Sequence, residues 1–324
     1  MKILVTGGAG FIGSNFIYYI LNKYPDYRIV NLDKLTYAGN LDNLKEVELK
    51  FKDRYEFIKG DICDEVLVNK IMVSVDVIVH FAAESHVDRS IENPDEFLRT
   101  NILGTHTLLK SALKNGKKRF HHISTDEVFG TLSLDNKEEK FDENTSYDPR
   151  SPYSASKAAS DHLVSAYYHT YGLPVTISNC SNNYGPFQYP EKIIPLFILN
   201  AFKDKPLPIY GSGKFIRDYI YVEDHCKGID LVLHKGKLGE KYCFGGDSER
   251  NGIEIADIIL NVLNKPDSLK EFVKDRPGHD MRYAIDFTKA KEELGWIPEV
   301  TFEEGIKKTI EWYKNNEDWY NKLI

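Results

Sequence analysis

Cysteine is scarce in this chain of 324 residues, and its four cysteines lie far apart, at Cys63, Cys180, Cys226 and Cys243. Their spacing matches no metal-ligand motif and no disulfide framework. His86, His121 and His122 are also too few and too irregularly spaced for a metal site. We therefore expect no bound metal, and thiols of the kind found in a reducing compartment.

Long apolar runs and an excess of positive charge are also missing. The longest apolar stretch, residues 193–202, is interrupted by Pro195 and Asn200 and is too short to span a bilayer. The first strand-like run begins at residue 2, which leaves no room for a signal peptide before it. The net charge of −7 argues against general attraction to nucleic acids or membranes. We expect a cytoplasmic protein that binds neither.

Strand-like and helix-like runs alternate through about the first 180 residues. Strands are predicted at residues 2–6, 29–32, 56–58, 75–81, 120–124 and 174–178, and helices at residues 14–23, 94–113 and 152–171. This order predicts an α/β fold with a doubly wound parallel sheet of the Rossmann type. We predict an NAD-binding domain at residues 1–178. A smaller mixed α/β substrate-binding domain, partly interleaved with the first, would occupy residues 179–324.

A glycine turn follows the first strand. Gly7, Gly10 and Gly13 allow close approach of a pyrophosphate, and the helix that follows offers free N–H groups and a positive dipole end. Asp33 lies 20 residues after Gly13, at the end of the second strand, where a carboxylate can accept hydrogen bonds from a ribose and repel a 2′-phosphate. This pattern predicts NAD binding. Lys34 is basic and leaves some tolerance of NADP open.

Two short segments carry groups suited to acid–base chemistry: Thr125, Asp126 and Glu127 in the first, Tyr153 and Lys157 in the second. A Tyr and a Lys four apart on a helix share one face, and the ammonium is expected to lower the pKa of the phenol. Such a phenol suits removal of a hydroxyl proton as a hydride leaves the same carbon. Adjacent carboxylates suit removal of water and of a carbon-bound proton. The alternatives are an acid-rich helix start, and a core Tyr beside a surface Lys.

Arg217 and Arg276 lie in loop-like contexts, where an Arg fork suits a pyrophosphate. A surface salt bridge is the favoured explanation of either arginine from the sequence alone. The composition of residues 182–186 is typical of a turn, and this interpretation is favoured over a ligand contact.

With these motifs, the chain resembles the extended short-chain dehydrogenase/reductase superfamily, and within it the dTDP-glucose 4,6-dehydratases. The resemblance runs nearly end to end and includes the glycine turn and residues 33–40, 82–90, 125–127, 153–157 and 275–279. The adjacent Asp126 and Glu127 are the part of the resemblance that is most specific to this family. Phe129 stands where the family usually has Tyr, and Tyr219 where Trp is more usual. The family's Asn expected near residue 252 appears as Asn251, so its contact with substrate stays open.

The resemblance implies a lyase that converts dTDP-glucose to dTDP-4-keto-6-deoxy-glucose for dTDP-rhamnose and related deoxysugars. Tyr153, with Lys157 and Thr125, would remove the proton of the C4 hydroxyl as hydride moves from C4 to NAD. Glu127 would take the C5 proton, and protonated Asp126 would donate to the departing C6 hydroxyl. Hydride would then return to C6, so NAD should stay bound between turnovers.

The resemblance also implies specific contacts. Besides the three glycines, Tyr153 and Lys157, NAD would contact Phe11, Ile12, Asp33, Lys34, Thr36, Gly39, Asp61, Ile62, Ala82, Ala83, Ser85 and Thr100. The substrate would contact Ser85, Thr125, Asn182, Lys192, Arg217, Arg276 and His279. Two helices, near residues 95–114 and 152–171, would form the subunit contact of a homodimer.

Other functions stay open. The chain can be another NDP-glucose 4,6-dehydratase, because the preference for thymidine rests on family likeness alone. A nucleotide-sugar 4-epimerase is disfavoured, since related epimerases have small or hydroxyl residues in place of Asp126 and Glu127. A redox sensor or scaffold that keeps the NAD fold without catalysis would be expected to lose Tyr153 or Lys157, and both are present.

Overall fold

Seven parallel strands form the central sheet of the computed structural model, which describes residues 1–275 and 280–324. Their order across the sheet is β10-β6-β5-β4-β1-β2-β3. In chain order the strands are β1 Lys2–Thr6, β2 Arg28–Asp33, β3 Tyr55–Lys59, β4 Val77–His80, β5 Arg119–Thr125, β6 Val175–Cys180 and β10 Lys241–Phe244. The predicted doubly wound parallel sheet is confirmed.

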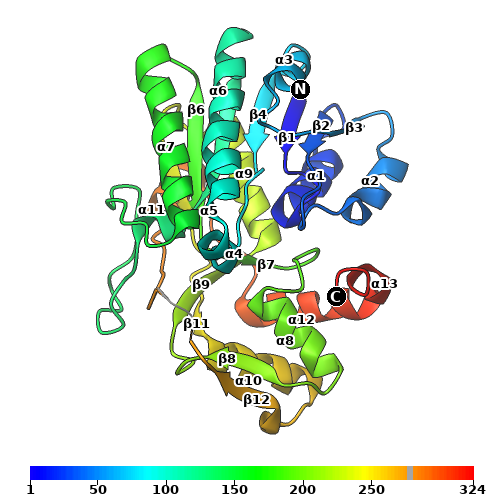
Figure 1. The fold of residues 1–324 in the computed structure, drawn as a ribbon, viewed down its shortest axis with the longest axis vertical. Helices are drawn as coiled ribbons and strands as arrows, with labels where there is room; N and C mark the ends of the chain where they lie inside the picture. The colour runs from blue at the N-terminus through cyan, green and yellow to red at the C-terminus, as the bar shows by residue number, and fades with distance from the viewer. Residues whose placement is uncertain (276–279) are drawn as a thin grey trace.

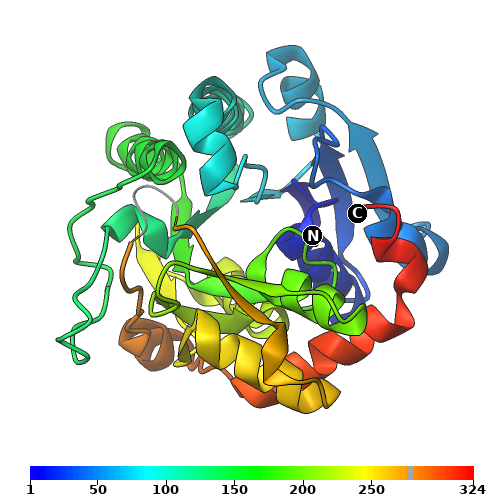
Figure 2. The same ribbon diagram turned by 60° about the horizontal axis from the view of Figure 1, so that its bottom comes forward.

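Helices cover both faces of this sheet (Figures 1 and 2). On β1, Ile3 and Val5 point to the face covered by α1 (Phe11–Lys23), α2 (Lys45–Lys50) and α9 (Val222–Lys235). Leu4 points to the opposite face, covered by α3 (Glu65–Met72), α6 (Thr105–Lys114) and α7 (Pro152–Tyr171). The inner strands are thus buried on both sides, which explains the near-continuous apolar runs in the sequence.

Capping residues set the bounds of α7, which match the predicted helix at residues 152–171. The Ser151 side chain accepts a hydrogen bond from the N–H of Ser154, and Pro152 occupies the first turn. Gly172, with φ of 64°, ends the helix in the left-handed region. The helix predicted at residues 94–113 is divided into α5 (Pro94–Phe97), a π-helical segment η2 (Leu98–Gly104) and α6.

The smaller part lies below the central sheet in Figure 1. It contains a three-stranded sheet of β7 (Asn182–Tyr184), β9 (Ile216–Tyr221) and β11 (Glu249–Asn251), and a pair of β8 (Leu207–Tyr210) and β12 (Lys270–Val273). Its core lies between these strands and α8 (Ile193–Phe202), α10 (Gly252–Leu263), α12 (Phe302–Asn315) and α13 (Glu317–Tyr320). The remaining helices are α4 (Val87–Glu92), α11 (Thr288–Leu294), and the 3-10 turns η1 (Leu41–Leu44), η3 (Asp126–Phe129) and η4 (Asp267–Leu269).

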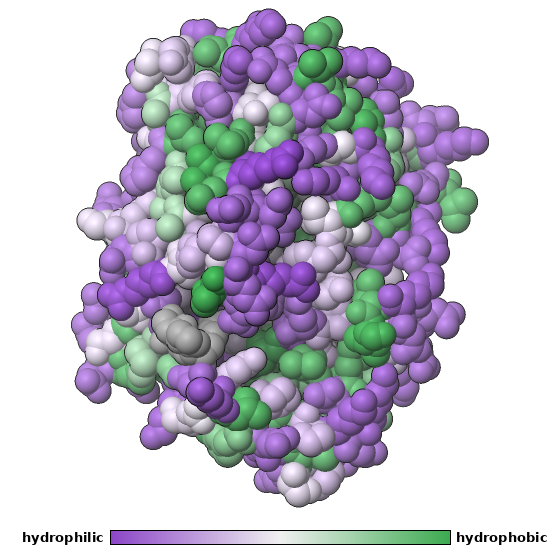
Figure 3. All heavy atoms as spheres, in the orientation of Figure 1, coloured by the Kyte–Doolittle hydropathy of each residue, from purple (hydrophilic) through white to green (hydrophobic). Residues whose placement is uncertain are grey.

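Strand β10 joins the large sheet although it follows β7, β8 and β9 in sequence. The predicted domain boundary at residue 178 stays a prediction. Among residues 1–275 and 280–324, no helix combines the length and apolar character needed to cross a membrane. Figure 3 shows a largely hydrophilic face, with apolar side chains gathered between α6 and α7.

Candidate active site

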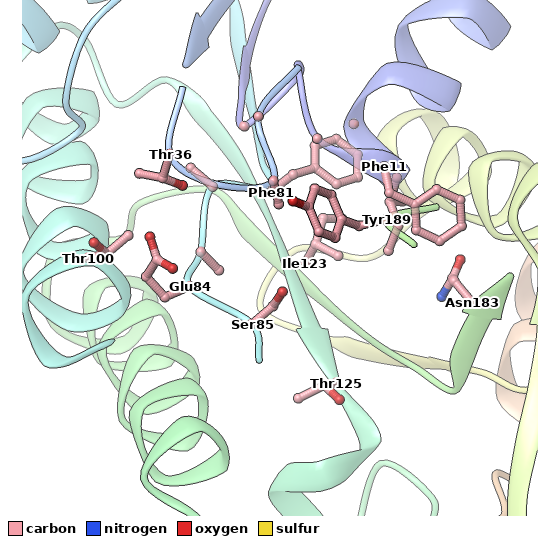
Figure 4. A pocket seen from close by; sticks show the side chains of 18 of the residues that line it. Phe11, Thr36, Phe81, Glu84, Ser85, Thr100, Ile123, Thr125, Asn183 and Tyr189 are labelled. Carbon is pink, nitrogen blue, oxygen red and sulfur yellow. The ribbon is translucent and has the colours of Figure 1, made fainter. Parts of the chain in front are cut away.

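A cavity opens at the carboxyl ends of the parallel strands, between the large sheet and the smaller part. Its lining comes from the ends of β1, β2, β4, β5 and β6 and from the loop before α8. In Figure 4, Thr125 marks the end of its strand, and Phe11, Phe81 and Tyr189 gather at the other side of the opening. This is the edge at which α/β sheets of this type bind ligands.

The glycine turn forms one wall of the cavity. Gly7 has φ of 72°, and a Cβ there would lie 2.6 Å from the backbone nitrogen of Ala82. A Cβ on Gly13 would lie 2.4 Å from the carbonyl oxygen of Gly7. Both positions therefore require glycine, because any side chain would push apart β1, the β4 loop and α1. The first turn of α1 carries no acidic residue and lines the cavity, and the free N–H groups of a helix N-terminus favour a bound anion.

The carboxylate of Asp33 organises the loops around the same wall. It accepts hydrogen bonds from the N–H of Ala9 at 2.9 Å and the N–H of Leu35 at 2.8 Å. Burial raises the pKa of Asp33, and these two N–H groups oppose that increase. Lys34, the next residue, forms an ion pair with Asp61, 3.0 Å between Nζ and Oδ2. The basic side chain that could favour a 2′-phosphate is thus paired with a carboxylate.

Thr125, Asp126 and Glu127 lie where β5 turns into η3. The hydroxyl of Thr125 accepts from the N–H of Glu127 at 3.3 Å and donates to Asp126 Oδ1 at 3.2 Å. Asp126 is 1% exposed. Burial, followed by the negative charges of Glu127 and Asp218, raises the pKa of Asp126 well above its usual range. A buried carboxyl group whose pKa is raised is better suited to serve as a proton donor.

Tyr153 and Lys157 lie on one face of α7 and line the same cavity. The Nζ of Lys157 donates to the carbonyl oxygen of Ile123 at 2.7 Å. Burial lowers the pKa of Lys157 to about 8. The expectation of a lowered pKa for Tyr153 is wrong for this structure, because burial and the charge of Glu127 raise it well above its usual value.

Comparison with known proteins identifies the family. Residues 4–309 match the sequence profile described as GDP-mannose 4,6 dehydratase. The chain is 52% identical to a dTDP-glucose 4,6-dehydratase from Escherichia coli, over 100% of this chain and 96% of that protein. It is 53% identical to a dTDP-glucose 4,6-dehydratase from Shigella flexneri, over 100% of this chain and 95% of that protein.

The chain belongs to the dTDP-glucose 4,6-dehydratase family.

Solved structures agree with this family assignment. A dTDP-glucose 4,6-dehydratase from Bacillus anthracis in complex with NAD has a TM-score of 0.93 at 48% identity, with full coverage of both chains. The corresponding enzyme from Streptomyces venezuelae, with NAD bound, has a TM-score of 0.96 at 46% identity, again over both whole chains. A UDP-glucose 4-epimerase from Thermotoga maritima has a TM-score of 0.90 at 29% identity, covering 98% of this chain and 100% of that chain. The fold alone therefore does not separate dehydratases from epimerases.

Most of the residues that the sequence predicted for the site line the cavity described above. They comprise every predicted cofactor contact, the predicted catalytic residues Thr125, Asp126, Glu127, Tyr153 and Lys157, and the predicted substrate contacts Ser85, Asn182 and Lys192. Their individual roles stay predictions. No cluster of metal-ligating side chains is present in the part of the chain that the structure describes.

Among the described residues, the predicted substrate contact Arg217 does not line the cavity. Arg217 is buried, donates to the carbonyl oxygens of Ile216 and Asp280, and lies over the Tyr283 ring, with 4.1 Å from the guanidinium carbon to the ring centroid. It is therefore not the surface arginine that the sequence favoured. Arg276 and His279 lie outside the described residues.

The cavity also includes residues that the sequence did not single out. Phe81 follows β4 directly, so its position at a strand end was a usable signal. Tyr189 and Glu191 come from an irregular loop, and no pattern in its sequence indicates which of its side chains point into the cavity. Tyr37 packs edge-to-face against Tyr189, with ring centroids 5.5 Å apart, which links the two parts of the chain across the cavity.

Proposed function

We propose that this chain is an NAD-dependent dTDP-glucose 4,6-dehydratase that forms dTDP-4-keto-6-deoxy-glucose. The observation that carries this proposal is the placement of Asp126 and Glu127 in the same cavity as Tyr153 and Lys157. A 4-epimerase needs only oxidation and reduction at C4, whereas a dehydratase also needs an acid and a base for the loss of water. The names of the relatives support the same choice.

The residues around the glycine turn fit a dinucleotide. Gly7 and Gly13 leave room for close backbone approach, the N-terminus of α1 lacks an acidic residue, and Asp33 ends β2 beside them. We propose that these residues hold the adenosine and pyrophosphate of NAD, with Thr36, Gly39, Asp61 and Ile62 near the adenosine end. When bound, NAD supplies a hydride acceptor and a positively charged ring.

The protein's own side chains would then carry out four proton transfers. Tyr153 would act as a phenolate, which the Thr125 hydroxyl and the Lys157 ammonium favour against the effect of burial, and would accept the proton of the C4 hydroxyl as C4 becomes a ketone. The new ketone acidifies the proton on C5, and Glu127 removes it. Asp126, whose pKa burial raises, donates its proton to the C6 hydroxyl, which leaves as water. Glu127 returns a proton to C5 when hydride reaches C6. Tyr153 must then release the proton that it gained, and Asp126 must regain the one that it gave to the departing water, before the next turnover.

Compared with the proposed NAD site, the proposed substrate site includes more residues from the smaller part of the molecule. We propose that Ser85, Thr125, Asn182 and Lys192 contact the nucleotide sugar, since all four line the cavity. Arg217 is proposed to act on the same ligand, although here it faces Tyr283 and Asp280. The division into an NAD part at residues 1–178 and a substrate part at residues 179–324 belongs to this proposal.

We also propose a cytoplasmic homodimer formed through the surface between α6 and α7. Leu98 and Leu103, in the segment that leads into α6, are 46% and 58% exposed. They are consistent with the apolar side chains on this face in Figure 3. Exposed apolar side chains that gather on one face are typical of subunit contacts. All four cysteines are unpaired, as in proteins of a reducing compartment.

The test is direct incubation of purified protein with the glucose derivatives of dTDP, UDP, CDP and GDP. We expect a 4-keto product and loss of the C6 hydroxyl from dTDP-glucose. Conversion of glucose to galactose without loss of oxygen would identify an epimerase and contradict the proposal. Turnover of another NDP-glucose in preference to dTDP-glucose would correct the base specificity alone.

A further inference from the structure

Asp161 is a buried carboxylate that the proposed mechanism does not use. It lies on α7 one helical turn after Lys157 and is 2% exposed. Three groups donate hydrogen bonds to its Oδ2: the Ser124 hydroxyl at 2.8 Å, the Tyr147 hydroxyl at 2.9 Å and the Asn179 amide at 3.3 Å. Asp161 is not part of the lining of the proposed NAD cavity. Any effect on catalysis must therefore pass through its neighbours.

His122 connects this carboxylate to Lys157. Its Nε2 lies 3.2 Å from Asp161 Oδ1 and 3.4 Å from Lys157 Nζ. Burial, and next the charge of Lys157, lowers the pKa of His122 to about 4, so the ring is neutral near pH 7.

Two further titratable groups face this cluster, and both are uncharged near pH 7. His80 on β4 lies 5.2 Å from the His122 ring between centroids, and burial lowers its pKa well below the usual value. Cys180 on β6 is a thiol whose pKa burial raises to about 12. Asp161 and Lys157 therefore act on each other as charges across neutral His122.

Burial opposes both of these charges, and each supports the other. Burial raises the pKa of Asp161, but the contacts with His122 and the charge of Lys157 outweigh it and keep this pKa below its usual range. Burial lowers the pKa of Lys157, and Asp161 is the first charge that opposes this decrease. A buried ion that loses its partner tends to become neutral, because it cannot regain its hydration.

We propose that Asp161 is a positioning residue that keeps Lys157 protonated across His122, and thereby sets the pH range in which Tyr153 can act as a base. The link to catalysis rests on the proposed function. The effect on Lys157 does not, because it depends only on the contacts described here.

Through its contact with the Tyr147 hydroxyl, Asp161 also borders a region that is open to solvent. Asp161, Tyr147 and His162 line a second cleft, separate from the NAD cavity. His162 contacts the Tyr147 ring, with centroids 5.1 Å apart. His162→Gln therefore provides a control that changes this cleft and leaves the Asp161 charge in place.

The first experiment titrates Lys157 directly in protein that carries its bound cofactor. Lysine is labelled with ¹³C at Cε, and the Lys157 resonance is assigned by its absence in Lys157→Met. In Asp161→Asn, which keeps the side-chain shape, we expect the midpoint to fall by about one pH unit or more, because an opposite charge nearby typically shifts a pKa by ~1–3 units. His162→Gln should keep the wild-type midpoint. An unchanged or higher midpoint in Asp161→Asn would overturn the proposal.

A second measurement needs no variant at Asp161. The ¹³Cγ resonance of Asp161 in wild-type protein, assigned through its own backbone, should remain that of a carboxylate from pH 8 down to pH 5. A protonated Asp161 within that range would leave Lys157 without its counter-charge and would overturn the proposal.

The third experiment tests whether the charge of Asp161 affects the pH dependence of C4 oxidation. In a single turnover with dTDP-glucose, the alkaline limit of reduced-nicotinamide formation should move to lower pH in Asp161→Asn. An equal loss of rate at every pH would show a merely structural role and contradict the inference. A wild-type protein that never reduces NAD would contradict the proposed function, and the ¹³C titrations would still decide this inference.

Discussion

The ammonium of Lys34 lies 3.0 Å from the carboxylate of Asp61, and the pair joins the ends of β2 and β3 at the edge of the cavity. The side chains of Lys34 and Asp61 are 42% and 21% exposed, so the pair contributes little to stability. Its consequence concerns the cofactor: a lysine held by Asp61 cannot readily neutralise a 2′-phosphate, and Asp33 beside it repels one.

Cofactor preference should therefore change in two steps. Asp33→Ser removes the repelling carboxylate, and the additional change Asp61→Asn releases Lys34. We expect the ratio of NADP affinity to NAD affinity to rise with the first change and again with the second, measured by calorimetry on protein stripped of cofactor. Glu65→Gln, which breaks the exposed pair with Lys110 on α3 and α6, is the matched control and should leave the ratio unchanged. Equal ratios in all variants would show that these side chains do not select the cofactor.

Purified protein should carry NAD although none is added. The proposed redox cycle ends with the cofactor as it began, so nothing is gained by releasing it at each turnover. Denaturation followed by ion-exchange chromatography of the supernatant should recover NAD or NADH close to one per chain. Asp33→Ala should lower this occupancy. Protein that contains neither form and does not bind NAD tightly would contradict the prediction.

Tyr153→Phe should abolish the first chemical step and leave the fold intact. The variant keeps the ring that packs against Phe97 but loses the phenolic oxygen that is proposed to accept the proton of the C4 hydroxyl. On addition of dTDP-glucose, we expect no reduced-nicotinamide absorbance. Tyr171→Phe, at the exposed end of the same helix, is the control and should react at the wild-type rate. Formation of reduced cofactor by Tyr153→Phe at the normal rate would exclude this role for the phenol.

The sequence predicted those parts of the molecule that depend on local pattern. The parallel sheet follows from buried apolar runs alternating with helices, and the glycine turn and Asp33 are neighbours along the chain as well as in space. Tyr153 and Lys157 share a face because helical spacing requires it. Each of these features is decided within one element or between consecutive elements.

Other parts depend on distant packing and left no local signal. Arg217 looked like a surface residue, but β9 buries it and Tyr283 covers its guanidinium. The pKa of Tyr153 was expected to fall because Lys157 is close in sequence, whereas burial dominates it in the fold. The loop that carries Tyr189 packs against α12, through the Tyr313 hydroxyl on the Gln188 carbonyl oxygen and Trp312 on the Phe187 ring. Such effects require knowledge of which residues are buried together.

Arg282 should be important for stability although it does not line the cavity. Its side chain is fully buried and forms a two-bond contact with Glu249, at 2.6 and 2.8 Å. It also donates to the carbonyl oxygens of Asn136, Lys137 and Glu139, which fixes the charged loop of residues 135–143 beside β11. Arg282→Met should lower the free energy of unfolding by roughly 2–5 kcal/mol, because these acceptors lose their donor inside the protein.

Urea denaturation of cofactor-bound protein would measure this loss. Arg150→Met is the control, since Arg150 pairs with Asp148 on the surface and should change the free energy of unfolding by less than about 1 kcal/mol. Equal stability of the two variants would show that the Arg282 contacts are replaced by water.

The last prediction separates oxidation from elimination. Asp126 and Glu127 are proposed to act only after C4 is oxidised, so Asp126→Asn/Glu127→Gln should still reduce NAD when dTDP-glucose is added. Formation of the 6-deoxy product should fall by several orders of magnitude, because each acid or base typically contributes ~10²–10⁴-fold and the two effects need not add. Both changes preserve side-chain shape, so the fold should survive. Asp135→Asn/Glu138→Gln, in the charged loop, is the matched control and should keep full activity.

Solvent deuterium tests the same division of roles at the level of one atom. If Glu127 removes the C5 proton and later returns one, wild-type product made in D₂O should carry deuterium at C5, whereas the hydride that reaches C6 should come from C4 and remain protium. In the double variant, substrate recovered after NAD reduction should keep protium at C5, since the base is missing although the ketone has formed. A double variant with full dehydratase activity would remove Asp126 and Glu127 from the mechanism. One that binds dTDP-glucose but cannot reduce NAD would place these carboxylates in the oxidation step instead of the elimination.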